Sequence, residues 1–319
     1  MIVEVAPSEG RRGSATYKIL SLDGGGSKGV YTIGVLREVE ALVGKPLCEY
    51  FDLVFGTSTG AIITALIGLG YKTEEIERLY LELIPAVMKH RTKRGRTKAL
   101  EAAATRVFGD KTFSDLKIDT GIVATNYEFE RPMVFKQSVR QAHGGKSTFE
   151  PGFGCTIADA VIASCAAFPF FRMRSLTTAK TGQVVVLDGG YVANNPTLFA
   201  LADAKQALGI SLADMAVLSV GVGSYNEPKR TFLHRAIFSL WPFRHMAKMF
   251  NISSKTIEQL RYLLFAEVAT VRINETYAQA EYATDLLEYD PDKLRKLLSL
   301  GRESFAYHEK EIRDVFGLS

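Results

Sequence analysis

The stretch DGGGSKG, residues 23–29, decides the fold because it separates a short apolar run from a helical pattern. The run Tyr17–Leu22 predicts a buried strand, whereas four glycines in the seven residues of 23–29 suit neither a strand nor a helix. Residues 30–43 carry apolar side chains at helical spacing and end at Gly44. A strand, a glycine-rich turn and a helix in this order predict an α/β protein, with parallel strands where the order repeats.

A second short motif, GTSTG at residues 56–60, lies between an apolar run at 51–55 and a buried helical pattern at 58–69. This is the setting of a G-x-S-x-G nucleophile elbow, in which a sharp turn exposes the serine hydroxyl above the sheet. Gly56 and Gly60 would allow that turn, and Ser58 would be the nucleophile. Five small residues also occur in ordinary turns, so the flanking strand and helix carry this prediction.

The two loops are separated by one helix and one strand, so both should emerge at the same edge of a parallel sheet. Backbone N–H groups of Gly24, Gly25 and Gly26 could then stabilise an oxyanion beside the serine, with Lys28 adding positive charge. The loop also matches the dinucleotide pattern G-x-G-x-x-G, but the second strand ends in Phe55 without the acidic residue that binds the ribose. A Walker loop is excluded by the order of Ser27, Lys28 and Gly29.

A base for the serine is expected at Asp188, which follows the apolar run 184–187 and precedes Gly189 and Gly190. A carboxylate at the carboxyl end of a strand lies on the active edge of an α/β sheet. The histidines that would complete a Ser–Asp–His order lie in helical, apolar or basic stretches: His234, His245 and His308. An esterase or thioesterase with a triad therefore stays an alternative.

The motifs DGGGSKG, GTSTG and DGG (188–190), in this order, resemble the patatin-like phospholipases. Two weaker matches are ASCAAFP at 163–169 and Asn194-Asn195-Pro196. The resemblance covers about residues 17–225. It implies a lipid acyl hydrolase that cleaves membrane phospholipid esters through an acyl-enzyme. The residues that it implies are the nucleophile Ser58, the base Asp188, the oxyanion hole of Gly24, Gly25 and Gly26, and the supporting Lys28, Gly56, Gly60, Gly189 and Gly190. The family usually has arginine where Lys28 stands, so a bidentate role does not carry over.

The resemblance also implies a three-layer α/β/α fold with a mostly parallel central sheet. We expect a flexible N-terminus over residues 1–16, a catalytic core over 17–225, and a helical C-terminal extension over 226–319 packed on that core. The last segment has apolar and basic residues interleaved in a helical pattern from Thr231 onward.

Composition narrows the class of partner. The net charge of +4 over 319 residues does not indicate a nucleic acid polymer as partner. Cys48, Cys155 and Cys165 lack metal-ligand spacing, and no cofactor or metal is expected. Neither an apolar signal segment nor a stretch long enough to span a bilayer is visible, which predicts a cytoplasmic protein.

Two segments bear on how lipid and regulators are reached. Residues 89–98 form a dense basic run, which suits a solvated loop, an anionic membrane surface or a phosphate-bearing regulator. Residues 231–250 suit an interfacial lid or, more often for such a pattern, a buried contact helix interrupted at Pro242. Peripheral membrane association and a homo-oligomer are further expectations.

The chain is also similar to stand-alone bacterial patatins that degrade membranes in phage defence. That resemblance implies a cyclic nucleotide activator. A non-catalytic lipid- or nucleotide-binding module is the remaining alternative. The presence of Ser58, Asp188 and the glycine loop together argues against it.

Overall fold

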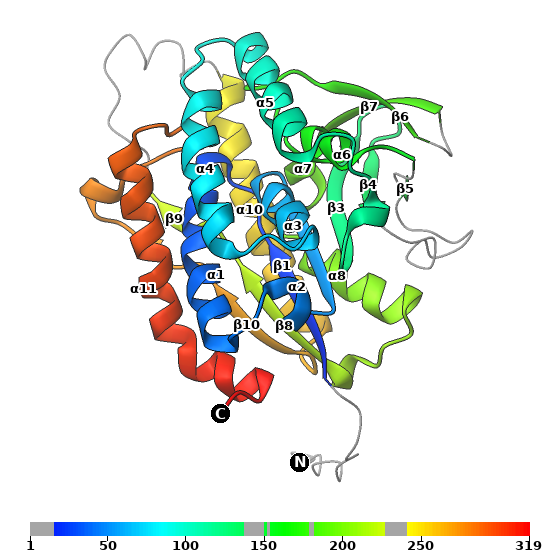
Figure 1. Cartoon of the computed structure of the whole chain (residues 1–319), viewed down its shortest axis with the longest axis vertical. Coiled ribbons are helices and arrows are strands. Elements are labelled where there is room, and N and C mark those ends of the chain that lie inside the picture. The colour runs from blue at the N-terminus through cyan, green and yellow to red at the C-terminus, as the bar shows by residue number, and fades with distance from the viewer. Residues whose placement is uncertain (1–15, 137–149, 152–153, 179–181, 227–240) are drawn as a thin grey trace, which may run out of the picture.

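A nine-stranded sheet forms the middle of the molecule (Figure 1). The computed structural model describes residues 16–136, 150–151, 154–178, 182–226 and 241–319, so nearly all of the flexible N-terminus expected at 1–16 lies outside it. The strand order is β10-β8-β1-β2-β3-β4-β5, with β7 paired to β3 and β6 paired to β7. The strands of this sheet are β1 (Tyr17–Leu22), β2 (Leu53–Thr57), β3 (Asp119–Asn126), β4 (Arg131–Lys136), β5 (Glu150–Pro151), β6 (Arg174–Thr178), β7 (Gly182–Asp188), β8 (Met215–Val220) and β10 (Ala269–Ile273).

Five strands, from β10 to β3, run parallel to their neighbours, and β4, β6 and β7 pair in antiparallel fashion. The central strands are buried on both faces, which explains why β1, β2 and β8 read as continuous apolar runs. The expected mostly parallel sheet is therefore confirmed.

Strand β3 has two partners on the same side, and this arrangement positions the site. Thr57, the last residue of β2, pairs with Val123, while Asp188, the last residue of β7, pairs with Ala124. Since β2 is parallel to β3 and β7 is antiparallel to it, their carboxyl ends point at one another. The residues that follow β2 and end β7 must therefore lie close together.

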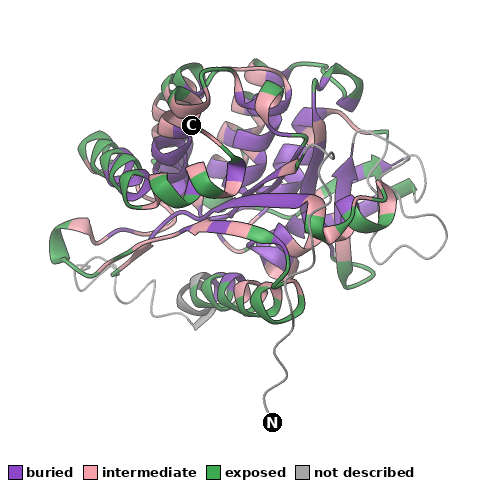
Figure 2. Ribbon diagram, turned by 90° about the horizontal axis from the view of Figure 1, so that it is seen from below, coloured by how far each residue is buried: buried purple, intermediate pink, exposed green. Residues whose placement is uncertain are grey.

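Helices cover both faces of the sheet, which confirms the three-layer architecture (Figure 2). Helices α1, α3, α4, α6 and α11 contribute to the larger core cluster, and α7 and α8 to the smaller one, with α10 packed on α7 and α8. The helices are α1 (Gly29–Val43), α2 (Leu47–Tyr50), α3 (Thr59–Gly68), α4 (Thr73–Met88), α5 (Lys93–Phe108), α6 (Ile157–Ser164), α7 (Gly190–Ala193), α8 (Thr197–Ala202), α10 (Trp241–Leu264) and α11 (Pro291–Phe316).

The C-terminal part is mainly helical, as expected, but it also contains strands that the sequence analysis did not predict. Strand β10 pairs in parallel with β8 at the edge of the central sheet, and a small second sheet joins β9 (Ser224–Tyr225) to β11 (Thr276–Tyr277). Strand β10 has only five residues and lies between the long helices α10 and α11. Its period-two pattern is therefore a weak strand signal within a mostly helical sequence. Residues 226–319 thus complete the core sheet, and α11 packs along α1.

The structure describes all of the basic run 89–98 and part of the segment 231–250. Residues 89–98 are not a loop throughout, because α5 begins at Lys93, capped by the Thr92 hydroxyl, which accepts the Gly95 N–H at 3.1 Å. Of the segment 231–250, residues 231–240 lie outside the described ranges. Pro242 lies in the first turn of α10, where proline is tolerated. None of the described helices combines the length and apolarity that a bilayer span requires.

Candidate active site

Ser58 occupies a strained turn between β2 and α3. Its backbone has φ 52° and ψ −118°, a conformation that is costly for a residue with a side chain. The Ser58 N–H donates to Ser164 Oγ at 2.8 Å, and Ser164 Oγ donates to the Val123 carbonyl at 2.6 Å. The surrounding structure thus holds the strained residue in place and leaves its hydroxyl facing the pocket.

The glycines around Ser58 and Asp188 are required by close backbone approach. A Cβ atom at Gly60 would collide with the Leu22 carbonyl, and one at Gly189 would collide with the Val123 carbonyl. A Cβ at Gly56 would meet the backbone of Gly60. These glycines therefore allow α3 and the turn after β7 to sit directly against the strand ends.

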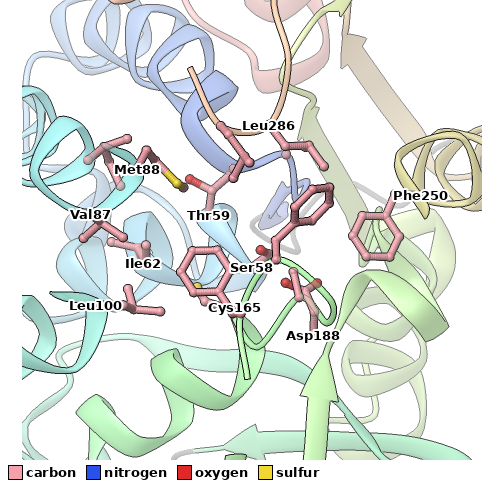
Figure 3. Close-up of a pocket in the computed structure, with 17 residues that line it drawn as sticks. Ser58, Thr59, Ile62, Val87, Met88, Leu100, Cys165, Asp188, Phe250 and Leu286 are labelled. Atoms are coloured by element: carbon pink, nitrogen blue, oxygen red, sulfur yellow. The ribbon is translucent and has the colours of Figure 1, made fainter. Parts of the chain in front are cut away.

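Asp188 faces Ser58 across the meeting point of β2 and β7 (Figure 3). Its side chain is fully buried, and its Oδ1 accepts the Gly190 N–H at 2.7 Å. Its Oδ2 has no donor in hydrogen-bonding geometry among the described residues. Burial raises the pKa of Asp188 to about 7, although the Gly190 N–H and the Ser58 hydroxyl each lower it. A carboxylate in this state can accept a proton near neutral pH.

The glycine loop supplies fewer free donors than the sequence predicts. The Gly24 N–H donates to the Asn194 carbonyl at 2.9 Å, so Gly24 is corrected from an oxyanion donor to an anchor of the loop. Asn194 Nδ2 donates in turn to the Gly24 carbonyl at 3.2 Å. Gly25 and Gly26 line the pocket beside Ser58, and their N–H groups have no acceptor in the part of the chain that the structure describes. They are the donors available to a ligand.

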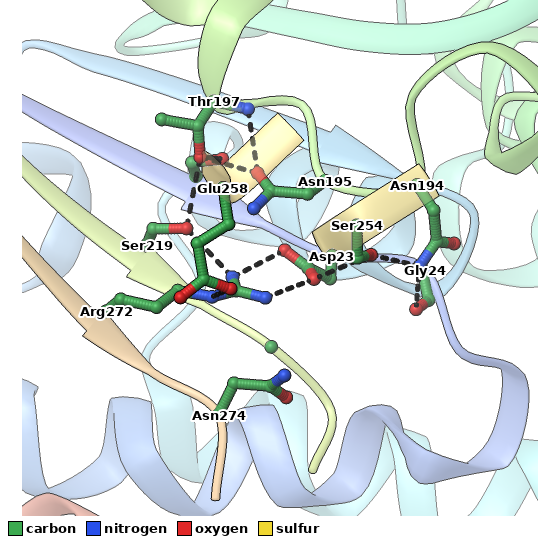
Figure 4. Close-up of polar contacts among 12 residues, drawn as sticks. Asp23, Gly24, Asn194, Asn195, Thr197, Ser219, Ser254, Glu258, Arg272 and Asn274 are labelled. Carbon is green, nitrogen blue, oxygen red and sulfur yellow. Dashed lines mark hydrogen bonds and ion pairs between the residues drawn. The ribbon is translucent and has the colours of Figure 1, made fainter. Parts of the chain in front are cut away.

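A buried polar network holds the start of this loop (Figure 4). Arg272 on β10 donates to both carboxylate oxygens of Asp23, from Nη1 to Oδ1 at 2.8 Å and from Nη2 to Oδ2 at 2.7 Å. Ser254 on α10 donates to the same carboxylate at 3.2 Å and accepts from Asn194 Nδ2 at 2.8 Å. Burial alone would lower the pKa of Arg272, but the attraction of Asp23 raises it above its ordinary value. The loop is therefore fastened to both α10 and β10.

Lys28 is buried beneath the loop and does not reach open solvent. Burial lowers its pKa to about 8, while the nearby carboxylates of Asp285 and Asp23 raise it. The adjacent Ser27 N–H donates to the Leu286 carbonyl at 3.1 Å. Lys28 thus lies where its charge can act through the loop, not where it could bind an anion directly.

The pocket in front of Ser58 is apolar and continues between helices (Figure 3). A second cavity between α4 and α5 shares part of its wall, at Ile62, Ile84, Val87 and Leu100. The farther cavity ends at residues of α5 and α6, among them Val107, Phe108 and Val161. The two cavities are therefore adjacent and both apolar, and we refer to the pair, which extends from Ser58 toward α5 and α6, as the hydrophobic channel.

Three residues of the site were missed as functional candidates. Ser164, Cys165 and Asn194 fall within the two weaker motif matches, which could have pointed to them. Cys165 lines the pocket, and burial raises the pKa of its thiol well above the ordinary value. Asp188 raises it further, and the Ser58 hydroxyl lowers it. Its thiol therefore stays protonated beside the Ser58–Asp188 pair.

No histidine lines this pocket in the described part of the chain. His308 pairs instead through Nε2 with Glu275 Oε1 at 2.8 Å, and His90 is exposed. His143 and His234 lie outside the described residues, and the side chain of His245 is not described. A metal site is a separate question. Across the described ranges, no group of three or more His, Cys, Asp or Glu side chains could hold a metal ion.

The sequence profile of the family described as patatin-like phospholipase matches residues 20–201, more than half of the 319 residues. The chain belongs to the patatin-like phospholipase family. This patatin-like phospholipase is 52% identical over 297 residues to a cUMP-AMP-activated phospholipase of Escherichia coli, with 93% of each chain covered. It is 30% identical over 207 residues to a cGAMP-activated phospholipase of Pseudomonas aeruginosa, covering 61% of this chain and 59% of that protein.

One solved structure supports the same fold. The human GIVD cytosolic phospholipase A2 aligns with a TM-score of 0.51 at 11% identity, over 96% of this chain and 61% of that one. Family membership confirms the expected enzyme class, a lipid ester hydrolase.

Proposed function

We propose that this patatin-like phospholipase cleaves carboxylic esters of membrane phospholipids through a Ser58–Asp188 dyad. The observation that carries the proposal is the meeting of β2 and β7 against consecutive residues of β3, which places a strained serine beside a buried carboxylate in one apolar pocket. The hydrophobic channel that continues between α4 and α5 suits a fatty acyl chain.

The reaction follows from the positions of these groups. Asp188 accepts the proton of the Ser58 hydroxyl as Oγ attacks the ester carbonyl carbon. The resulting oxyanion is stabilised by the N–H groups of Gly25 and Gly26, and each such donor is worth about 3–4 kcal/mol. Collapse expels the alcohol, which takes the proton from Asp188, and leaves an acyl-enzyme. Water then attacks the acyl carbon and gives its proton to Asp188, and a second collapse returns a proton to Ser58 and releases the fatty acid.

The test is covalent labelling by a fluorophosphonate together with release of fatty acid from phospholipid vesicles. Ser58→Ala should abolish both, whereas Ser211→Ala, at an exposed serine, should leave both unchanged. Labelling that persists in Ser58→Ala would contradict the assignment of the nucleophile. Loss of activity on changing His234, His245 or His308 to Ala would instead favour the triad esterase.

We further propose that a cyclic nucleotide activates the enzyme and that it works in the cytoplasm, attached to the membrane when active. Support comes from the two bacterial relatives, whose names state activation by cUMP-AMP and cGAMP. Fatty acid release should rise on titration with cUMP-AMP. Release that is the same with cUMP-AMP, cGAMP and no nucleotide would count against this proposal. Sedimentation with and without nucleotide tests the homo-oligomer expected from the sequence.

A further inference from the structure

The basic run after α4 directly follows residues that line the hydrophobic channel. Val87 and Met88, the last residues of α4, line the pocket, and Lys89 follows them directly. Leu100 on α5 lines both cavities. The cations of residues 89–98 therefore lie between two segments that line the channel.

Contacts inside the run fix it against the pocket. Arg96 is buried, and its Nε donates to the Phe170 carbonyl at 3.0 Å while its Nη1 donates to the His90 carbonyl at 2.7 Å. The Arg172 N–H donates to Thr97 Oγ1 at 2.9 Å. Phe170 and its neighbour Phe171 both line the pocket. Arg96 is thus a structural tie, and the other cations of the run are presented from a fixed backbone.

Four of the remaining cations face outward without an ion pair among the described residues, and the nearby Glu101 is paired with Arg174. Lys89, Arg91, Arg94 and Lys98 are exposed and form no ion pair with any described residue. The sequence from residue 83 to residue 100 contains no Asp or Glu. Four unpaired cations within ten residues of the chain create a local positive potential.

Apolar side chains lie beside the same run. Phe168 is 37% exposed, with Lys93 Nζ 5.1 Å from its ring centre, and Met173 is 40% exposed beside Arg172. Cations mixed with exposed apolar groups suit the headgroup boundary of a bilayer, where charge attracts the surface and apolar groups enter it.

We propose that the four cations Lys89, Arg91, Arg94 and Lys98, with Phe168 and Met173, form a docking rim that binds anionic bilayers and aims the channel mouth at lipid. This deepens the proposed phospholipase function, on which it rests. The rim acts through its field, since it lacks the convergent, buried donors of a specific phosphate site. Each cation near an anionic membrane contributes about 1 kcal/mol, or about a fivefold change in partition.

The test uses the full chain carrying Ser58→Ala, so that binding is measured without hydrolysis and independently of the proposed chemistry. Co-sedimentation is measured with vesicles of phosphatidylcholine alone and with added phosphatidylglycerol. Changing the four rim cations to Gln should weaken binding to anionic vesicles by at least about tenfold. A matched variant changes four exposed cations elsewhere to Gln, namely Lys45, Lys72, Arg78 and Lys310, and should bind as the parent does.

Two further arms separate a membrane field from a specific phosphate site. Exchanging Lys and Arg at the four positions keeps the charge and should preserve binding, and raising the salt concentration should weaken it. Inorganic phosphate at equal ionic strength should not compete more than chloride. Equal binding by the rim and matched Gln variants, no preference for anionic vesicles, or selective competition by phosphate would each overturn the proposal. A thermal melt of each variant shows that it is folded.

Discussion

At the scale of single residues, the electrostatics of Asp188 matter most. A buried carboxylate would be a poor base if a strong ion pair lowered its pKa, but the buried Arg272 is paired with Asp23. Desolvation instead raises the pKa of Asp188 to about 7. The same desolvation that makes the group a base also makes its charged form costly.

The pH dependence of the reaction follows from this pKa. The ionised form of Asp188 is required, so kcat/KM should fall about tenfold per pH unit below about 7 and level off above it. The measurement is kcat/KM on a soluble ester substrate across that range. A profile that is flat from pH 5 to 8 would contradict the role of Asp188.

Asp188 should also destabilise the protein at high pH. The folded pKa lies above the unfolded one, so its stabilising effect is complete below about pH 4 and is lost as the pH rises through about 7. Asp188→Asn should therefore abolish hydrolysis and stabilise the fold at pH 8 by about 2–4 kcal/mol. Urea unfolding of both proteins at pH 8 measures the difference. The advantage of the variant should shrink at pH 5, and an equal difference at the two pH values would argue against this origin.

At the scale of elements, the oxyanion loop is held by an ion pair between the end of β1 and β10. Arg272→Gln leaves the buried Asp23 carboxylate without its cation, so the fold should lose about 3–5 kcal/mol. The loop should also loosen, which lowers kcat more than it changes KM. Urea unfolding and steady-state kinetics check both effects.

The matched control for this prediction is the double variant Asp23→Asn with Arg272→Gln. Because it removes both charges, it should recover most of the lost stability. If the double variant is no more stable than Arg272→Gln alone, the loss does not come from an uncompensated charge.

The channel between α4 and α5 should set the preference for acyl chain length. Ala103 on α5 lines the far cavity, so Ala103→Leu should shorten the channel and reduce hydrolysis of long-chain esters relative to short-chain ones by at least about tenfold. Ala102, one position earlier, is exposed, and Ala102→Leu provides the control on the same helix. Competition between long- and short-chain substrates in one reaction gives the ratio. An unchanged ratio in Ala103→Leu would place the acyl chain elsewhere.

The elements of the site were largely predictable, since each motif was local. A glycine-rich turn after one strand and G-x-S-x-G after the next indicate their own positions, and Asp188 follows its own apolar run. The fastening of the loop was not predictable, because Arg272 and Ser254 reach Asp23 from more than 200 residues away. The residues around Arg272 and Ser254 form no motif that would identify them as partners of Asp23. For the same reason the use of the Gly24 N–H by Asn194 could not be foreseen.

At the scale of the whole molecule, the C-terminal part is packed into the sheet and helices of residues 17–225. Strand β10 pairs with β8, α11 packs along α1, and Arg272 neutralises Asp23. A chain ending at residue 225 would expose the edge of β8 and leave that buried charge unpaired.

We therefore expect the fragment 1–225 to lack a cooperative unfolding transition, although it contains every motif residue. Circular dichroism during thermal unfolding is the measurement. Co-expression with residues 226–319 as a separate chain should restore a transition. A fragment that melts cooperatively alone would show that the core is independent.

The tail-to-tail meeting of β2 and β7 also bears on how the protein can change over evolution. Val123 and Ala124 are consecutive residues of β3, and their pairing with Thr57 and Asp188 fixes the positions of the proposed nucleophile and the proposed base. Insertions and deletions in the loops of residues 59–187 can change the surface without shifting either group, provided that the pairing with β3 is kept. A single residue inserted between Val123 and Ala124 would move the Ser58 hydroxyl and the Asp188 carboxylate apart by about 3.3 Å, the rise of one strand position. Such an insertion should abolish hydrolysis.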